Sequence, residues 1–372
     1  MHRKPYFVLS PCGTSLFTNV VSNEERPLVA KYANTKSFDQ IPEADAAVLS
    51  KILARANDKL AAADVAAVVR ISAELNSIVR LYGSIIKGPQ DVHVLLCTDT
   101  WLGNQSAELV KAWLEKHELQ NVQVRRQTDL QTASLQAFQC ALSGLVEWCE
   151  ETVTGYQLAN YHVVFNLTGG FKSVQGFLQT LAMFYADETI YVFETGNELL
   201  RIPRLPIKMD FEATILGHLN VFRRLSQGLK VTDSEHIPET LLMQLDGDLT
   251  LSAWGDLVWK RSKKDIYEKT LHPSPSEKIV FSPQFEKSIE NLPTDRLLLI
   301  NERIDQLARY LEIDRPQGRP SLRGLDFKDV QRNPKPPSTH ELDAWSDKDA
   351  RRIFGHFEGP VFHLDKLDKG LH

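Results

Sequence analysis

The sequence contains one short segment whose residue types and spacing suit the binding of phosphate. Residues 166–173 read NLTGGFKS and lie between an apolar stretch and an amphipathic one, so they would join a strand to a helix. Adjacent glycines let a ligand approach the backbone, and free N–H groups at a helix start attract anions. Lys172 adds a cation, and Thr168 and Ser173 add hydroxyls. The spacing is neither that of a Walker A loop nor that of a G-x-G-x-x-G motif. The alternative interpretation is a Gly-Gly turn with a capping serine.

Two other segments have the same small, hydroxyl-rich character. Residues 10–15 (SPCGTS) follow the first apolar run of the chain, and residues 97–100 (CTDT) follow another. In parallel sheets, ligands bind beyond the carboxyl ends of the strands. Three such loops at strand ends therefore predict a polar ligand cradle and make the Gly-Gly turn the weaker interpretation.

A second group of candidate residues lies near the C-terminus. Residues 315–335 carry six basic and two acidic side chains, and the tail adds His356, His363, Lys366 and Lys369. Cleavage of RNA through its 2′-hydroxyl needs a base, an acid and cations near the phosphate, and arginine suits the last role because its charge is permanent. Residues 279–372 as a whole hold 15 basic and 16 acidic side chains, so pairing of surface Arg and Lys with carboxylates explains the counts equally well.

The elements that would position the first group alternate between strands and helices. β-Branched or aromatic runs occupy residues 6–10, 92–97, 121–125, 161–167 and 189–194. Ala, Leu and Val recur at helical intervals in four further ranges, which predicts helices at residues 46–61, 65–83, 106–117 and 132–151. Near-continuous apolar strands separated by helices predict a parallel sheet covered on both faces. Residues 1–207 are therefore expected to form an α/β domain.

Two further blocks follow this domain. Residues 208–272 read as mostly helical, with an apolar stripe from Phe211 to Leu225 and a second helical stretch at 238–260 around a DGD turn. A winged-helix-like module and a helical connector that packs a dimer both fit this block. HPSPSEK (272–278) predicts a linker. Residues 279–372 predict a small α+β domain with a helix at 294–311 and strands at 340–345, 350–357 and 361–367.

The composition of the chain excludes several classes of protein. Its 372 residues are 42% hydrophobic and 24% charged, which excludes wholesale disorder. The net charge of −5 means that any nucleic acid must bind through local patches. No apolar run suits a membrane span, and the N-terminus reads as a first strand rather than a signal peptide. The four cysteines lack metal-binding spacing and suit a reduced, cytoplasmic protein.

LSPCGTS (9–15), SAELNSI (72–78) and FNLTGGFKS (165–173) resemble the CARF domain, the Rossmann-like sensor of cyclic oligoadenylates in type III CRISPR systems. The resemblance covers about residues 1–205, and TGGFKS is its most specific part. It implies that the domain forms a homodimer and that a two-fold symmetric ring lies across two copies of the cradle. The residues that the resemblance places against the ring are Thr14, Ser15, Thr98, Thr168, Gly169, Gly170, Lys172 and Ser173.

Residues 280–372 resemble the RelE superfamily of ribosome-dependent mRNA interferases. SPQFEKSIENLP is followed by a long helix, PSLRGL, HELDAW, ARRIFGHF and a strand ending in DKLDKG. By this resemblance Arg323 lies in the family's L-R/K-G turn, Arg352 contacts the scissile phosphate, and Lys366 and Lys369 are the final basic residues. Glu341 and Asp343 stand where related sequences carry two lysines, so Glu341 or a histidine such as His363 is the candidate base.

Together the two resemblances imply a CRISPR ancillary effector in which a cyclic oligoadenylate, expected to be cyclic tetra-adenylate, activates cleavage of mRNA on translating ribosomes. No cofactor, metal or membrane partner is expected. One alternative is a ligand-controlled transcription regulator that binds DNA through residues 208–272; residues 238–258 hold no basic side chain, and only WKRSKK (259–264) supports it. Another is a ring nuclease that degrades the ligand through Thr14, Lys172 or Ser173, which leaves the C-terminal domain without a role.

Overall fold

The structure, a computed structural model, describes residues 3–83, 88–131, 133–193, 198–206, 211–231, 234, 236–322, 324–330 and 336–370. The chain divides into two compact units, residues 1–208 and residues 209–372, and each unit has a large sheet of its own. The residues predicted as a middle block and as a C-terminal domain therefore belong to one unit. No helix within the described ranges is long and apolar enough to cross a membrane.

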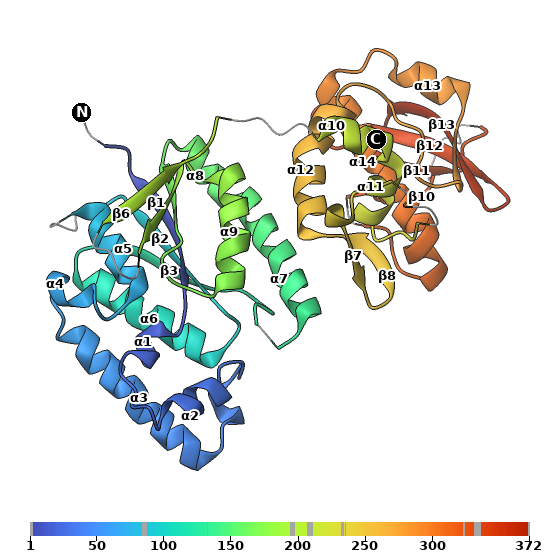
Figure 1. Ribbon diagram of the computed structural model, residues 1–372. Coiled ribbons are helices and arrows are strands. Elements are labelled where there is room, and N and C mark those ends of the chain that lie inside the picture. The colour runs from blue at the N-terminus through green and yellow to red at the C-terminus, as the bar shows by residue number, and fades with distance from the viewer. Residues whose placement is uncertain are drawn as a thin grey trace. The chain divides into compact units, whose positions relative to one another are not determined.

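The first unit is built on a six-stranded sheet (Figure 1). Its strands lie in the order β3 (Asn121–Arg126), β2 (Val92–Cys97), β1 (Tyr6–Cys12), β4 (His162–Asn166), β5 (Glu188–Val192) and β6 (Leu199–Pro203). The first five strands are parallel, and β6 runs antiparallel to β5. The strand order reverses between β1 and β4, because the chain proceeds from β1 to β3 on one side and returns to β4 on the other. The predicted α/β fold with a parallel sheet is confirmed; β6 was not predicted.

Helices cover both faces of this sheet. Phe7 and Val8 are neighbours on β1, so their side chains point to opposite faces, and both are fully buried. The Phe7 ring packs against Trp148 of α7 (Leu135–Trp148) and Tyr156 of α8 (Thr154–Leu158), with ring centroids 6.4 and 4.5 Å apart. Val8 packs with Leu81 of α5 (Ala73–Tyr82). Burial on both sides explains why these strands have near-continuous apolar sequences.

Two helices that the sequence predicts as single elements are interrupted. The predicted helix 65–83 is divided into α4 (Val65–Val68) and α5, which begins after Ser72 because the Ser72 side chain accepts the N–H of Leu75. The predicted helix 132–151 continues from α7 through a π-helical turn, Cys149–Val153, into α8. The remaining helices of this unit are α1 (Ser15–Thr18), α2 (Arg26–Lys31), α3 (Glu43–Ala61), α6 (Trp101–Lys116) and α9 (Lys172–Tyr185).

The main sheet of the second unit has five strands in the order β10 (Lys328–Asp329), β11 (His340–Trp345), β12 (Arg351–Glu358), β13 (Val361–Lys369) and β9 (Ile279–Phe281). Strands β10 to β13 form an antiparallel meander, and β9 pairs in parallel with β13. After α13 (Pro283–Ile289), α14 (Thr294–Arg309) places Ile300 and Ile304 in one core with Leu342 and Ile353 of the sheet. All three strands predicted at 340–367 are present.

The N-terminal part of the second unit differs from the prediction. The predicted helix from Phe211 to Leu225 is divided at His218 into α10 (Glu212–Gly217) and α11 (Leu219–Ser226). Part of the predicted helical stretch 238–260 is a hairpin of β7 (Leu242–Leu245) and β8 (Asp248–Leu251), followed by α12 (Ala253–Tyr267). Asp246 and Gly247 have φ of 52° and 86°, the backbone that two-residue hairpin turns need and that Asp-Gly favours. The Asp-Gly pair between apolar residues is the sequence signal for this hairpin.

Candidate functional site

The loops after β1 and β4 meet at the carboxyl edge of the first sheet, around one buried carboxylate. Glu74 of α5 is fully buried, and its Oε1 accepts the backbone N–H of Gly13 at 3.0 Å. Its Oε2 accepts the hydroxyl of Ser72 at 2.7 Å. Burial raises the pKa of Glu74, although hydrogen bonds from Gly13, Ser72 and the backbone of Gly170 oppose that shift. The carboxylate therefore connects both loops to α5.

The packing around Glu74 leaves no room for a Cβ at Gly169 and little room for one at Gly13. A Cβ on Gly169 would lie 2.3 Å from Oε1 of Glu74, and a Cβ on Gly13 would lie 3.2 Å from Cα of Gly170. Gly170 has φ of +94°, a conformation that favours glycine. The sequence favours the close approach of a ligand as the reason for the Gly-Gly pair. The structure adds a second reason at Gly169, because Glu74 fills the space that a Cβ would need.

A second buried polar side chain supports the loop after β4. Asn166 ends that strand; its Oδ1 accepts the Ser77 hydroxyl at 2.6 Å, and its Nδ2 donates to the Ser10 hydroxyl at 3.0 Å. These bonds join β4 to α5 and β1. Neither Glu74 nor Asn166 is among the site residues predicted from the sequence. The available signal was a carboxylate beside Leu75, on the side of the helix that becomes fully buried.

Two of the predicted ligand residues have hydrogen-bond partners inside the protein. Thr98 is 4% exposed, and its hydroxyl shares a hydrogen bond of 2.8 Å with that of Thr100. The Thr168 hydroxyl accepts the backbone N–H of Val192 at 3.1 Å, which ties the loop after β4 to β5. Both threonines therefore stabilise the edge of the sheet, and neither hydroxyl points freely outward.

Lys172, Ser173 and Thr14 remain at least partly accessible in the cradle, whereas the hydroxyl of Ser15 is buried. Lys172 and Ser173 are exposed at the N-terminus of α9, where the N-cap residue Phe171 makes no side-chain hydrogen bond to the helix. Thr14 and Ser15 are half-buried, and within the described residues Ser15 Oγ is buried with no hydrogen-bond partner. Because a helix N-terminus presents free N–H groups and partial positive charge, this end of α9 suits a phosphate.

In the second unit, Arg352 of β12 is enclosed by carboxylates. Its guanidinium lies 2.9 Å from Glu341 and 2.8 Å from both Asp326 and Asp343, and its side chain is 9% exposed. Asp343 is paired with Arg352 across the strands, and Glu341 follows on the same face of β11. The structure thus brings two predicted site residues, Arg352 and Glu341, into direct contact. The three carboxylates compete with an RNA phosphate for the Nη1 and Nη2 donors of Arg352.

The other basic residues of the predicted effector site lie on different faces. Lys366 pairs with Phe354 across the strands, on the face that carries Arg352, and lies 3.5 Å from Asp368. Lys369 is exposed and pairs with Arg351, on the opposite face. Arg323 lies outside the described residues.

His363 lies directly opposite His356, and the two rings are stacked with centroids 5.3 Å apart. Nδ1 of His356 is 3.0 Å from the carboxylate of Asp365, and the hydrogen bond to Asp365 raises the pKa of His356. Nε2 of His356 and Nε2 of His363 lie 3.4 and 3.5 Å from oxygens of Glu358. His363 therefore has a titratable partner that was absent from the predicted site.

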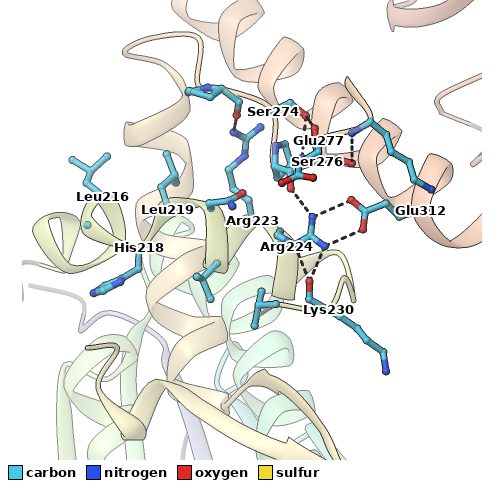
Figure 2. Close-up of a pocket in the computed structure, with 17 residues that line it drawn as sticks. Leu216, His218, Leu219, Arg223, Arg224, Lys230, Ser274, Ser276, Glu277 and Glu312 are labelled. Atoms are coloured by element: carbon cyan, nitrogen blue, oxygen red, sulfur yellow. Dashed lines mark hydrogen bonds and ion pairs between the residues drawn. The ribbon is translucent and has the colours of Figure 1, made fainter. Parts of the chain in front are cut away.

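A pocket of about 940 Å³ lies in the second unit beside α10, α11 and residues 273–278 (Figure 2). Arg224 makes two hydrogen bonds of 2.9 Å to Glu312 and one of 2.6 Å to the carbonyl of Pro275. Arg223 donates to Asp305 at 2.7 Å and to the carbonyl of Pro273. These bonds hold residues 273–275 against α11, so the predicted linker is a packed segment. The arginines of the pocket are bound to the protein itself.

The basic run WKRSKK lies in the second half of α12. Lys263 pairs with Glu302 at 2.6 Å, and Lys264 lies 3.9 Å from Glu268. Lysines near a helix C-terminus also interact favourably with the helix dipole. The run therefore has a structural explanation that does not require DNA.

The first unit is thus an α/β structure whose polar loops meet where the strand order reverses, the place at which such sheets bind their ligands. Residues 69–205 match the model of a family described as CRISPR-associated protein (Cas_APE2256). The matched range begins just before Glu74 and includes the TGGFKS segment, and the match supports a CRISPR-related role. No curated protein matches the chain.

Proposed function

We propose that the protein is a CRISPR ancillary effector in which a cyclic oligoadenylate binds the cradle of the first unit and activates a ribonuclease in the second. The ribonuclease cleaves mRNA on translating ribosomes by attack of the 2′-hydroxyl and needs no metal. The match of residues 69–205 to a CRISPR-associated family supports the role in CRISPR defence. The resemblance of residues 280–372 to the RelE superfamily supports the ribonuclease.

The observation that carries the sensor proposal is the exposed N-terminus of α9 beside the half-buried loop after β1. A cyclic oligoadenylate carries one negative phosphodiester per nucleotide. Lys172 and the backbone N–H groups of α9 can donate charge-assisted hydrogen bonds to such a phosphate. Thr14, Ser15 and Ser173 supply hydroxyls around the same loops. Since Glu74 holds the two loops together, the donors are fixed in place before the ligand arrives.

Replacement of Lys172 by alanine tests the sensor. We expect the affinity for cyclic tetra-adenylate to fall about 10-fold or more, because a hydrogen bond to a charged group contributes roughly 1.5–3 kcal/mol. Isothermal titration calorimetry measures this, with Lys51→Ala on the exposed side of α3 as the matched control. Equal affinities in the wild-type protein and Lys172→Ala would contradict the cradle, as would failure of the wild-type protein to bind either the tetra- or the hexa-adenylate ring.

The effector is tested in a translating extract with and without the cyclic ligand. The proposal requires cuts in mRNA only when the ligand and ribosomes are both present, and fragments that end in a 2′,3′-cyclic phosphate. Intact mRNA under all conditions, with ligand binding normal, would reject the ribonuclease and leave the sensor in place.

A further inference from the structure

We propose that His356 and His363 are the catalytic acid and base of the ribonuclease site, and that Asp365 positions His356. This inference rests on the proposed function, because it assigns the groups that would move protons during RNA cleavage. It replaces Arg352 as the centre of the chemistry with a cluster on the β12–β13 hairpin, which we call the histidine cluster: Ser338, His356, Glu358, His363 and Asp365.

The hairpin itself aligns the two imidazoles. His356 and His363 pair directly across β12 and β13, so their side chains share one face of the sheet. The register shifts by one residue next to this pair: Phe354 pairs with Lys366 and Gly355 with Leu364, which leaves Asp365 as the extra residue of a β-bulge. Bulges redirect side chains and are frequent near active sites. Here the bulge brings the carboxylate of Asp365 to 3.0 Å from Nδ1 of His356.

Asp365 is held firmly enough to orient the ring. Asp365 is 5% exposed, and its Oδ2 also accepts a hydrogen bond of 2.7 Å from the hydroxyl of Ser338. A carboxylate that accepts the Nδ1–H of an imidazole fixes the ring orientation and leaves Nε2 to act on the substrate. The hydrogen bond to Asp365 raises the pKa of His356, which suits that ring to the role of the acid.

The two Nε2 atoms already converge on one anion. A single carboxylate, that of Glu358, places Oε1 3.4 Å from Nε2 of His356 and Oε2 3.5 Å from Nε2 of His363. The Glu358 side chain is 67% exposed and lies at the end of β12, so it can turn into solvent without loss of packing. A phosphodiester has oxygens with similar spacing and the same charge. It can therefore take the place of the Glu358 carboxylate between the two rings.

The resulting step is balanced in atoms and protons. Neutral His363 removes the proton of the 2′-hydroxyl while the O2′–P bond forms. The P–O5′ bond breaks, and protonated His356 gives its proton to O5′. The products are a 2′,3′-cyclic phosphate and a 5′-hydroxyl, one proton having been taken and one given. Neither a metal nor a redox partner takes part in the step.

The charges around His356 set its pH dependence. Asp365 and Glu358 face it as carboxylates, His363 faces it as a second imidazole, and Ser338 contributes a hydroxyl through Asp365. From the neighbouring strand β9, Val280 pairs with His363 and carries no charge. Both carboxylates favour the imidazolium, so an acid at His356 stays protonated to higher pH than an isolated histidine.

The test compares ligand-dependent mRNA cleavage by the wild-type protein and by His356→Gln, His363→Gln and Asp365→Asn. Loss of a general acid or base lowers rates about 10²- to 10⁴-fold, so each histidine variant should lose at least ~100-fold. Asp365→Asn should lose about 10-fold and should move the alkaline limb of the pH–rate profile to lower pH, because His356 then releases its proton more easily. Histidine NMR titration should show the same downward shift of the His356 pKa.

His236→Gln is the matched control, since His236 is an exposed histidine of the same unit outside the histidine cluster. Wild-type rates in both histidine variants, with ligand-dependent cleavage intact, would overturn the assignment and leave the proposed function standing. An unchanged pH profile in Asp365→Asn would remove Asp365 from its positioning role. A wild-type protein that cuts no mRNA would reject the proposed function and this inference together.

Discussion

At the residue scale, the cradle depends on a carboxylate that sequence patterns do not mark as functional. Glu74 is fully buried and accepts hydrogen bonds from Gly13 and Ser72. A buried carboxylate is tolerated only where such donors replace water. Its position explains the glycines around it, since any side chain at Gly169 would overlap Oε1. The packing of the loop therefore explains the glycine at position 169.

This explanation predicts the stability of Gly169→Ala. The new methyl group would lie 2.3 Å from Oε1 of Glu74, so the variant should be about 1–3 kcal/mol less stable, as is usual for overpacking. When Glu74→Ala is already present, the further loss on Gly169→Ala should be much smaller, because the clash is gone. Urea unfolding of the four proteins measures both effects.

Gly176→Ala is the control for this comparison of the wild type, the two single variants and the double variant. Gly176 lies inside α9, and a Cβ there would meet nothing within 4 Å. Alanine favours helices by up to about 1 kcal/mol over glycine, so this variant should be slightly more stable. Additive losses for Glu74→Ala and Gly169→Ala would show that the two residues do not meet.

At the element scale, β12 decides which side chains can act together. Arg352, Phe354 and His356 alternate onto one face of the strand, and Arg351 and Ile353 onto the other. Arg352 lies among Asp326, Glu341 and Asp343, whereas His356 has a partly open ring edge at the hairpin end. The same face therefore holds a structural ion cluster at one end and the histidine cluster at the other.

Arg352→Ala and Arg351→Ala should differ in the free energy of unfolding of the second unit, whatever their effect on activity. Removal of Arg352 leaves three carboxylates close together, so the second unit should lose about 3 kcal/mol, the low end for a broken buried ion pair. Arg351 pairs with Asp349 at the surface, and its loss should change stability by less than about 1 kcal/mol. Thermal unfolding measures both. Full stability with loss of cleavage in Arg352→Ala would instead favour direct contact with phosphate.

Strands could be predicted from the sequence where an apolar run marked them clearly. The strands of the first sheet carry apolar runs because both faces are covered, and the run at 92–97 coincides with β2. β6 was missed because its residues are mostly exposed and lack that signal. The sequence of the hairpin β7–β8 predicts a helix because its leucines fit the repeat of a helix as well as the two-residue repeat of a strand. Asp246-Gly247 marks the turn.

The candidate sites were only partly predictable, for a physical reason. Motifs located Lys172, Ser173 and His363, but contacts between distant segments decide what each side chain does. Thr98 and Thr168 are engaged with other protein groups, and the carboxylates around Arg352 come from β11 and from the loop before β10. Contacts between side chains of different segments cannot be predicted from the sequence of one strand alone.

At the scale of the whole molecule, the proposed sensor cradle and the proposed ribonuclease site lie in separate compact units. A variant of His356 removes no group of the cradle, so it should still bind the cyclic ligand. The net charge of −5 gives the whole chain no general attraction to RNA. Delivery of mRNA by the ribosome, as proposed, removes the need for such attraction.

The proposed two-fold symmetric ligand also makes a prediction about assembly. Each half of the ring needs the same cradle, so the protein should be an isologous dimer before or upon binding. Multi-angle light scattering should give about twice the chain mass of 42.2 kDa in the presence of cyclic tetra-adenylate. A stable monomer that binds one ring would contradict a ligand shared between two subunits.

The contact of Gly13, Glu74 and Gly169 has a consequence for how this protein can change over generations. The three residues come from three distant parts of the chain, and Glu74 contacts both glycine loops. A larger residue at 169 is excluded while the glutamate remains, and loss of the glutamate leaves the N–H of Gly13 without its acceptor. Positions 74 and 169 therefore each restrict what the other can accept. A larger side chain at position 169 should become compatible with the loops only when the side chain at position 74 has become smaller.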